Sequence, residues 1–277
     1  KLADGTRLLR EGDYSARVDL RLNNEFAQLQ DTLNDMAERI QEEMALRQKS
    51  EEDRRRLILD ISHDLKNPMS GIQGYAELLM KSPDIPEAQR THCLSMILSG
   101  SKRANRLLNE LFEISQLDSP DFVMKPERTD LCEALRQVCG ELVPRLEEAG
   151  ADFDFDIPED SVPVMLDRER FGRIIHNLAD NAIRHNPPGT RLDISLKTRE
   201  VQALIEVSDD GIGIRDDLAR NIFKPFMRGE EARGAQTGGS GLGLSIARKI
   251  ALAHGGGLDL AREKSKGSTF LLTLPII

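Results

Sequence analysis

The spacing of apolar residues changes near residue 119, and this change constrains the fold more than any other feature of the chain. Before it, apolar residues recur every three or four positions, as in amphipathic helices. From about residue 127 onward, alternating strand-like runs are mixed with helical patterns and glycine clusters. The prolines of the segment 119–126 end the preceding helix and suit a short linker. The sequence therefore predicts a multidomain protein with a helical part followed by an α/β part.

The helical part begins with a predicted coiled coil. An extended stretch at 17–22 leads to a helix that opens at Asn23-Asn24-Glu25 and carries a narrow apolar seam. The seam consists of Phe26, Leu29, Leu33, Met36 and Ile40. The charged stretch 42–56 that follows suits either a solvated helix face or a parallel two-stranded coiled coil, and we favour the coiled coil.

Two amphipathic helices are predicted next, from near Glu51 to Lys81 and from about Glu87 to Asp118. The proline-containing segment 82–86 separates them. Such helices, joined by a tight loop, form an antiparallel hairpin that cannot cover both apolar faces by itself. We therefore expect a homodimer, in which two chains combine their hairpins into a four-helix bundle.

His63 has the position expected of a nucleophile, on the solvent-facing side of a predicted helix. His63 lies two residues from both Ile61 and Leu65, on the polar side of the predicted helix, and should face water. Asp64 is beside it, and Asn67 lies one helical turn further along. A neutral imidazole nitrogen is nucleophilic near pH 7, so this group has the makings of a phosphoryl acceptor. An ordinary surface histidine is the alternative.

The α/β part contains three polar clusters, and the first lies on a predicted helix at 173–185. Asn177, Asn181 and Arg184 project from one side of that helix at i, i+4 and i+7. Amide oxygens and a guanidinium on one face can hold hydrated Mg²⁺ and a phosphate chain. An ordinary helix lined with polar side chains is the alternative for this cluster taken alone.

The other two clusters are rich in glycine. Asp209, Gly211 and Gly213 follow a predicted strand at 203–208. Glycines there let the backbone approach a flat ring, and a buried carboxylate can accept a hydrogen bond from the amino group of adenine. A simple Asp-Gly turn is the alternative. The third cluster, 237–244, runs into a predicted helix at 245–253, where backbone N–H groups can cradle phosphates. The polar stretch 229–239 between the two is interpreted as a lid.

Charge and cysteine content exclude other kinds of function. A net charge of −9 and an aromatic content of 4% argue against nucleic-acid binding. No apolar run approaches the roughly 20 residues that span a bilayer. Cys93, Cys132 and Cys139 lack C-x-x-C spacing, so neither a disulfide framework nor a zinc site is expected.

As an ordered set, these motifs resemble those of the sensor histidine kinases of two-component systems. The motifs are His-Asp-Leu-Lys-Asn-Pro at 63–68, Asn-x-x-x-Asn at 177–181, Asp-x-Gly-x-Gly at 209–213, Phe-x-x-Phe at 223–226 and Gly-x-Gly-x-Gly at 239–243. The resemblance covers roughly residues 52–277, and residues 1–45 resemble part of a HAMP signal-relay domain. It implies a partial HAMP domain at 1–45, a dimerisation and histidine phosphotransfer hairpin at 46–118 and a linker at 119–126. An α/β sandwich ATP-binding domain of the gyrase, Hsp90, kinase and MutL superfamily follows at 127–277.

The resemblance also implies roles for individual residues. His63 is phosphorylated, Asp64 aids proton removal, and Asn67 serves phosphatase chemistry. Asn177 and Asn181 hold Mg²⁺ and phosphates, and Asp209 reads the adenine of ATP. The other implied nucleotide-binding residues are Arg184, His185, Gly211, Gly213, Phe223, Phe226, Arg228, Gly239, Gly241, Leu242 and Gly243. Among them, Arg228 is the candidate contact to the γ-phosphate, Gly239, Gly241 and Gly243 form the lid hinge, and Arg184 and His185 stand where Lys and Tyr are more usual.

The implied activity is that of an ATP:protein-histidine phosphotransferase. It autophosphorylates His63, passes the phosphoryl group to an aspartate in the receiver domain of a response regulator, and acts as a phosphatase of that regulator. The implied location is the cytoplasmic portion of a plasma-membrane sensor, joined to the membrane only through a missing N-terminal segment. A nucleotide-gated clamp ATPase is an alternative, but such a hydrolase would need a water-activating carboxylate where this chain has Asn177. A signalling scaffold would have no use for three nucleotide clusters.

Overall fold

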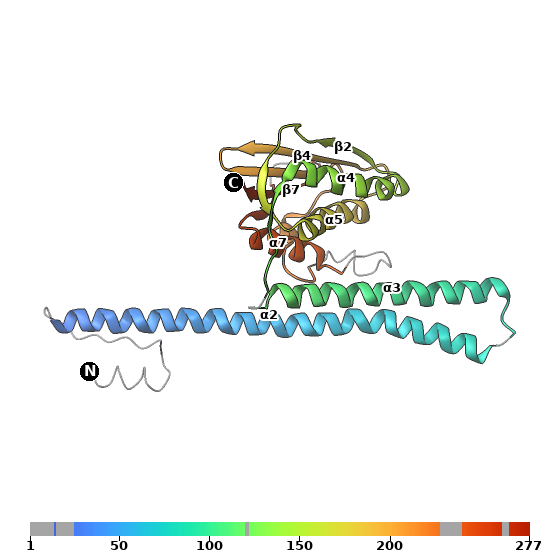
Figure 1. The fold of residues 1–277 in the computed structure, drawn as a ribbon. Helices are drawn as coiled ribbons and strands as arrows, with labels where there is room; N and C mark the ends of the chain where they lie inside the picture. Colours follow the sequence, from blue (N-terminus) through green and yellow to red (C-terminus); the bar gives the residue numbers. More distant parts are fainter. Residues whose placement is uncertain (1–13, 15–24, 83, 120–121, 228–239, 262–265) are drawn as a thin grey trace. The chain divides into compact units, whose positions relative to one another are not determined.

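The computed structural model describes Tyr14 and residues 25–82, 84–119, 122–227, 240–261 and 266–277 (Figure 1). The extended stretch predicted at 17–22, most of the predicted HAMP segment before residue 25, Arg228, Gly239 and the lid at 229–239 lie outside these residues. The chain divides into two compact units, residues 1–63 and 64–277, and each is described by itself.

The first long helix, α2 (Glu25–Lys81), begins and ends where the sequence predicts a beginning and an end. The separate helix predicted to start near Glu51 is wrong, because α2 runs without a break through the charged stretch 42–56. That stretch contains neither glycine nor proline and is rich in Glu and Arg, both good helix formers. Nothing in it interrupts the helix.

In the second unit, the end of α2 and the helix α3 (Glu87–Leu117) form the predicted hairpin. Gly100 of α3 lies so close to α2 that an added Cβ would be 2.9 Å from Ile72 Cγ1 and 3.3 Å from the carbonyl oxygen of Pro68. The rings of Tyr75 and His92 meet edge to face, with their centroids 6.2 Å apart. A residue without a side chain thus lets the two helices pack at short range.

The α/β part follows, with strands mixed with helices as predicted. Its elements are β1 (Glu127–Asp130), α4 (Leu131–Glu148), β2 (Asp152–Asp156), β3 (Pro163–Leu166), α5 (Arg168–His185), β4 (Arg191–Arg199), β5 (Gln202–Asp209), α6 (Asp216–Ala219), α7 (Gly243–Ala253), β6 (Gly257–Leu260) and β7 (Ser268–Pro275). One sheet has the strand order β2-β4-β5-β7-β6 and is parallel only between β2 and β4. A small second sheet pairs β1 with β3.

Helices α4, α5 and α7 cover one face of the larger sheet, so this part is a two-layer sandwich (Figure 1). The alternation along β5 buries Ile205 and Val207 under these helices, and β7 contributes Phe270 and Leu272. Asp209, which ends β5, is in phase with Ile205 and Val207, so its carboxylate turns toward the helices as well. The predicted order of a helical part followed by a mixed α/β domain is confirmed.

None of the helices in the described ranges combines the length and apolar character that crossing a membrane requires.

Candidate nucleotide-binding site

Asp209 is the buried acid of the site. Its side chain and backbone together are 5% exposed at the end of β5. Its Oδ1 accepts hydrogen bonds from the backbone N–H of Gly211 at 3.0 Å and from Nδ2 of Asn186 at 3.1 Å. The acid is therefore held by its own loop and by Asn186, the residue that directly follows α5, as a group that must present a fixed acceptor to a ligand would be.

Close backbone approach explains why this loop needs glycine. A Cβ at Gly211 would lie 1.9 Å from Oδ1 of Asn186. Gly213 has φ +75°, and a Cβ there would lie 3.1 Å from the carbonyl oxygen of Gly267. Gly267 itself has φ +79°, and a Cβ there would lie 1.9 Å from the carbonyl oxygen of Asp209. The loop after β5 and the turn before β7 thus pack backbone against backbone.

Helix α5 carries the first polar cluster and links it to the third. Asp167 caps the start of α5, where its Oδ1 accepts from the N–H of Arg170 at 3.2 Å. Nδ2 of Asn177 donates to the carbonyl oxygen of Gly243, at the first residue of α7, at 3.0 Å. Arg184 pairs with Asp180 one turn earlier, at 3.3 Å. The face of α5 that carries Asn177 therefore lies against the end of the Gly-x-Gly-x-Gly motif, which is called the glycine loop below.

The amide of Asn177 suits a bound cation. Because its Nδ2 is committed to the carbonyl of Gly243, its Oδ1 is the atom left to face a metal ion or a metal-bound water. Asn181 lies one turn further along the same face, half-buried like Asn177. Oxygen ligands of this kind are what Mg²⁺ prefers, and it usually keeps several waters when few protein atoms bind it. In the described part of the chain, no group of three or more His, Cys, Asp or Glu side chains is arranged to hold a metal.

The glycine loop is joined to the Phe-x-x-Phe motif by backbone contacts. Phe226, with φ +59°, donates its N–H to the carbonyl oxygen of Gly241 at 2.9 Å. Gly241 has φ +75°, and a Cβ there would lie 2.9 Å from the Cα of Phe226. Leu242 is buried at the start of α7, and its carbonyl accepts from the hydroxyl of Ser245 at 2.7 Å. Phe223 lies under the guanidinium of Arg248, which is 4.8 Å from the ring centroid.

The C-terminal end of α3 meets the arginines of α5. Glu113 pairs with Arg170 at 3.2 Å and with Arg173 at 3.1 Å. Glu110, one turn earlier, is buried, and its Oε2 has no hydrogen-bond partner among the described residues. Burial raises the pKa of Glu110, and the Ser240 hydroxyl and the charges of neighbouring arginines, Arg173 foremost, oppose that rise.

The predicted phosphoacceptor group lies on α2. His63 is exposed, as predicted, and so is Asn67, while Asp64 is half-buried. His63 belongs to the first compact unit and the nucleotide clusters to the second. Within the second unit, the structure brings the three polar clusters of the α/β part together. His185, at the end of α5, is exposed.

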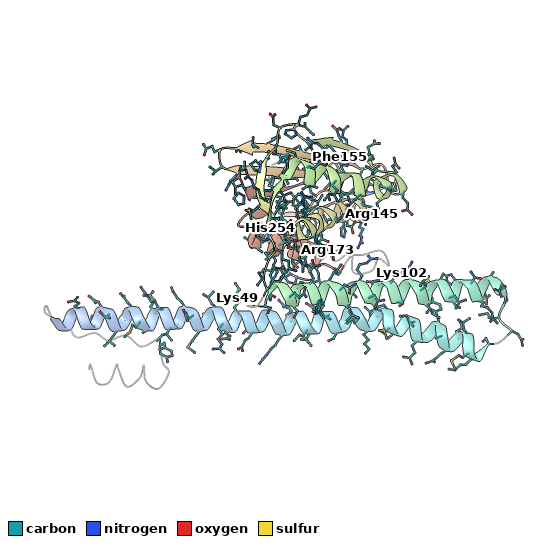
Figure 2. All side chains as sticks on the ribbon, in the orientation of Figure 1. Lys49, Lys102, Arg145, Phe155, Arg173 and His254 are labelled. Atoms are coloured by element: carbon teal, nitrogen blue, oxygen red, sulfur yellow. The ribbon has the colours of Figure 1, made fainter. Side chains whose placement is uncertain are left out.

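His254 is buried at the end of α7, where Nδ1 lies 2.8 Å from the carbonyl oxygen of Ile250 (Figure 2). Its Nε2 accepts from the backbone N–H of Asp167 at 3.1 Å. A nitrogen that accepts carries no proton, so the ring is neutral and joins α7 to the cap of α5.

Asn186 and Gly267 were missed by the sequence analysis. The signal for Asn186 was its position directly after the polar face of α5 and before Pro187-Pro188. The signal for Gly267 was a lone glycine ahead of the strand-like run 268–274. Both act through contacts with Asp209 that no local pattern contains.

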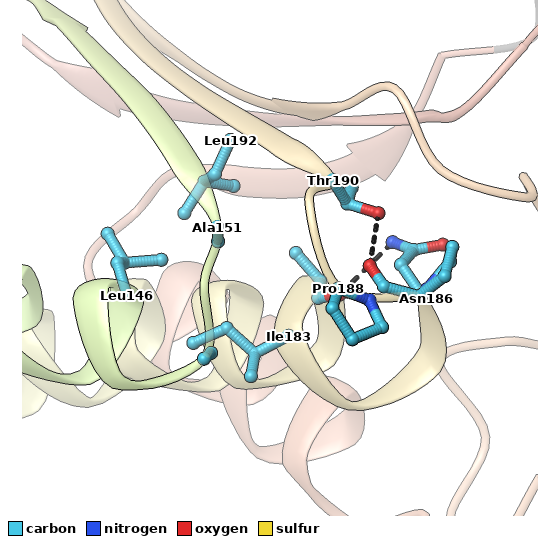
Figure 3. A pocket seen from close by; sticks show the side chains of 10 residues that line it. Leu146, Ala151, Ile183, Asn186, Pro188, Thr190 and Leu192 are labelled. Carbon is cyan, nitrogen blue, oxygen red and sulfur yellow. Dashed lines mark hydrogen bonds between the residues drawn. The ribbon is translucent and has the colours of Figure 1, made fainter.

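Asn186 also borders a small cavity on the α4 side of α5 (Figure 3). The cavity measures about 70 Å³ and is lined mostly by apolar side chains, including Leu146, Ile183 and Leu192. Pockets for drug-sized ligands have volumes of about 300–1,000 Å³. Asp209 and the glycine loops do not line it, so it is a packing gap beside the nucleotide clusters and not the nucleotide site itself.

Three known protein families match the chain in order. They are described as HAMP domain, which matches residues 1–42, His Kinase A (phospho-acceptor) domain, 53–120, and Histidine kinase-, DNA gyrase B-, and HSP90-like ATPase, 166–277. The fold and the site together define a histidine-kinase-type ATPase domain joined to a phosphoacceptor hairpin.

Relatives narrow the class further. Sensor protein GtcS of Aneurinibacillus migulanus is 34% identical over 250 residues, which are 90% of this chain and 67% of that protein. The structure of histidine kinase ThkA in complex with response regulator protein TrrA is similar with a TM-score of 0.65 and 25% identity, over 85% of this chain and 67% of that one. Full-length ShkA in complex with AMPPNP has a TM-score of 0.58 and 24% identity, over 80% and 46%. The chain belongs to the sensor histidine kinases of two-component systems, which excludes the clamp ATPase and the inactive scaffold as its class.

Proposed function

We propose that this chain binds ATP with Mg²⁺ between α5 and the two glycine loops and transfers the γ-phosphoryl group to His63. The observation that carries the proposal is the position of α5, which contacts the Asp209 loop through Asn186 and the glycine loop through Asn177. Three clusters far apart in the sequence therefore meet around one helix. ATP binding is the property of the family to which the chain belongs.

In this proposal, different residues contact the adenine and the phosphates of ATP. Asp209 accepts a hydrogen bond from the adenine amino group, and Gly211 and Gly213 let the base approach the backbone. The glycine loop, with Gly239, Gly241, Leu242 and Gly243, presents backbone N–H groups to the phosphates at the start of α7. Phe223 and Phe226 shape the loop between the two. Arg184, His185 and Arg228 contribute to nucleotide contact, with Arg228 at the γ-phosphate.

Asn177 and Asn181 would hold the metal, whose charge neutralises phosphate oxygens as the phosphoryl group is transferred. In the transfer, a nitrogen of His63 forms a bond to the γ-phosphorus while the bond from that phosphorus to ADP breaks. Asp64 orients the ring and takes part in removing its proton. Since phosphoryl transfer needs little covalent help from the protein, catalysis rests on position and charge.

We further propose that the domains are a partial HAMP relay at 1–45, a dimerisation and phosphotransfer hairpin at 46–118, a linker at 119–126 and an ATP-binding domain at 127–277. The hairpin dimerises into a four-helix bundle and passes the phosphoryl group to an aspartate of a receiver domain. ThkA, solved with a response regulator protein, supports this kind of partner. Asn67 serves the hydrolysis by water of the phosphoryl group on that aspartate, and the chain works as the cytoplasmic portion of a plasma-membrane sensor.

The direct test is transfer of label from γ-labelled ATP to the purified chain. The label should be lost in acid and kept in alkali, as expected of a phosphohistidine. His63→Gln should abolish labelling and leave nucleotide binding, measured by calorimetry, within about twofold, because the variant keeps every group at the nucleotide site. His92→Gln, which changes an exposed histidine of α3, is the matched control and should label normally. Acid-stable label on a serine or threonine would refute the assignment.

A further inference from the structure

Asn186 makes three hydrogen bonds at the end of α5, and the proposed function assigns it no task. Its Nδ2 donates to the carbonyl oxygen of Ala182 at 3.1 Å and to Oδ1 of Asp209 at 3.1 Å. Its Oδ1 accepts from the backbone N–H of Ile212 at 2.9 Å. One side chain therefore connects the end of α5, the buried acid Asp209 and the loop that follows β5.

These partners permit only one orientation of the amide. If the group were rotated by 180°, its oxygen would face two acceptors, the carbonyl of Ala182 and the carboxylate of Asp209. Its NH₂ would then face the N–H of Ile212. Donation from Asn186 to Asp209 is thus required by the rest of the network.

The same hydrogen bonds determine which oxygen of Asp209 is available to accept a hydrogen bond from a ligand. Among the described residues, the two hydrogen bonds that this carboxylate accepts, from Asn186 and from the N–H of Gly211, both go to Oδ1. Oδ2 is left to accept from a bound base. A carboxylate held this way suits the amino group of adenine, whereas a base with a carbonyl at the same position would place two acceptors against each other.

We propose that Asn186 is a positioning residue that sets the base selectivity of the nucleotide site through Asp209. The inference rests on the proposed function, namely that the site binds ATP. It also explains the glycine at 211: the space that a Cβ would need is filled by the Asn186 amide, 1.9 Å away. Asn186, Gly211 and Asp209 form one unit, in which the amide orients the acid and the glycine makes room for the amide.

The test compares two nucleotides on the full chain by calorimetry: ATP, and purine riboside triphosphate, which lacks the 6-amino group. The wild-type chain should prefer ATP at least about tenfold, because a site built to accept an N–H rejects the analogue without it. Asn186→Ala removes the donor to Asp209, and the nearly isosteric Asn186→Asp replaces it with an acceptor. Both should reduce that preference to less than about threefold, mainly by weakening ATP.

Gly211→Ala should act in the same way, because its new methyl group displaces the amide, while φ at this position lies outside the range that favours glycine. Thr190→Val is the matched control: its hydroxyl donates to the carbonyl of Pro187 at 2.8 Å in the same turn, so it should leave the preference unchanged.

The outcomes distinguish failure of this inference from failure of the proposed function, ATP binding. If the Asn186 variants, with unchanged melting temperatures, weaken both nucleotides by the same factor, Asn186 only supports the fold and the inference fails alone. Equal binding of both nucleotides by the wild-type chain would likewise overturn it. If the wild-type chain binds neither, the proposed function fails, and the inference with it.

Discussion

At the scale of the residue, Asn67 offers the clearest separation of two activities. It lies at i+4 from His63 on α2, which places the two Cβ atoms about 5–6 Å apart on one face. From there its amide can orient a water toward a phosphoaspartate without taking part in the attack of His63 on ATP. Asn67→Ala should keep autophosphorylation within about twofold and slow dephosphorylation of a response regulator by roughly a hundredfold, since orientation alone is worth that much in rate.

Both reactions are measured on the same purified variant, by label uptake from ATP and by label loss from the regulator. Its melting temperature should match that of the wild-type chain. Parallel loss of the two activities would mean that Asn67 only stabilises the helix before Pro68.

Cys139 should be chemically inert while the protein is folded. It is 2% exposed on α4, and burial raises the pKa of its thiol to about 12. Against the ordinary value of 9.0, this leaves roughly a thousandfold fewer thiolates at pH 8, and the thiolate is the reactive form. Iodoacetamide at pH 8, followed by peptide mass analysis, should modify Cys139 at least a hundredfold more slowly in the native protein than in denaturant. Equal rates would show that α4 does not bury this side chain.

Residues of the candidate site could be predicted from the sequence only where residue types and their spacing within a short stretch indicated a function. Asp209, Gly211 and Gly213 could be singled out because an acid and two glycines directly follow a strand-like run, a pattern that a simple Asp-Gly turn shares. Asn186 did not stand out, because an asparagine before two prolines is also typical of an ordinary helix end. Its task comes from contact with a loop more than 20 positions away, and such contacts leave no periodic signal.

At the scale of the element, α4 depends on a cap that also joins the small sheet to the helix. Oδ1 of Asp130 accepts from the N–H of Cys132 at 3.0 Å and from the N–H of Val162 at 3.2 Å. Burial works to raise the pKa of Asp130, but these hydrogen bonds outweigh it and hold the pKa below its usual value. Asp130→Ala should destabilise the domain by about 1–2 kcal/mol at pH 7.

The pH dependence follows from the direction of that shift. An acid with a lowered pKa in the folded state contributes stability above the ordinary value of 3.8, and the contribution is lost as pH falls through the folded pKa. Urea unfolding at pH 7 and near pH 3 should therefore show a smaller difference between Asp130→Ala and wild type at the lower pH. Glu159→Ala, at an exposed acid of the same domain, should show no difference at either pH.

Element types were predictable, and element boundaries less so. The strand β5 and the helix α7 lie within two residues of their predicted ranges, because a period of two and a glycine stop are strong local signals. The junction placed near Glu51 was wrong because a change from apolar to charged residues looks like a boundary. In a segment without glycine or proline, that change alters the polarity of the helix surface but does not end the helix.

At the scale of the whole molecule, the exposed apolar side chains of α3 are the basis for predicting the proposed dimer. Leu94, Leu98, Leu108 and Phe112 are 48–65% exposed and fall on one stripe of the helix. Light scattering should give about twice the 31.0 kDa mass of one chain. Leu98→Glu should weaken the dimer, because it places a charge in the stripe, whereas Ser99→Glu, one position off the stripe, should not. A monomer that still autophosphorylates would refute the bundle.

The interior position of β7 has a consequence for how the protein is made. This strand, between β5 and β6, is the last of the described strands to be synthesised, and the turn before it supplies Gly267, which packs on Asp209. Until translation has passed Pro275, β5 lacks one of its neighbours and the loop that follows it lacks its support. Nascent chains that stop short of Ser268 therefore leave β5 and β6 without the strand that lies between them and lack the turn that supports the Asp209 loop, so the proposed nucleotide site is complete only after β7 has been made.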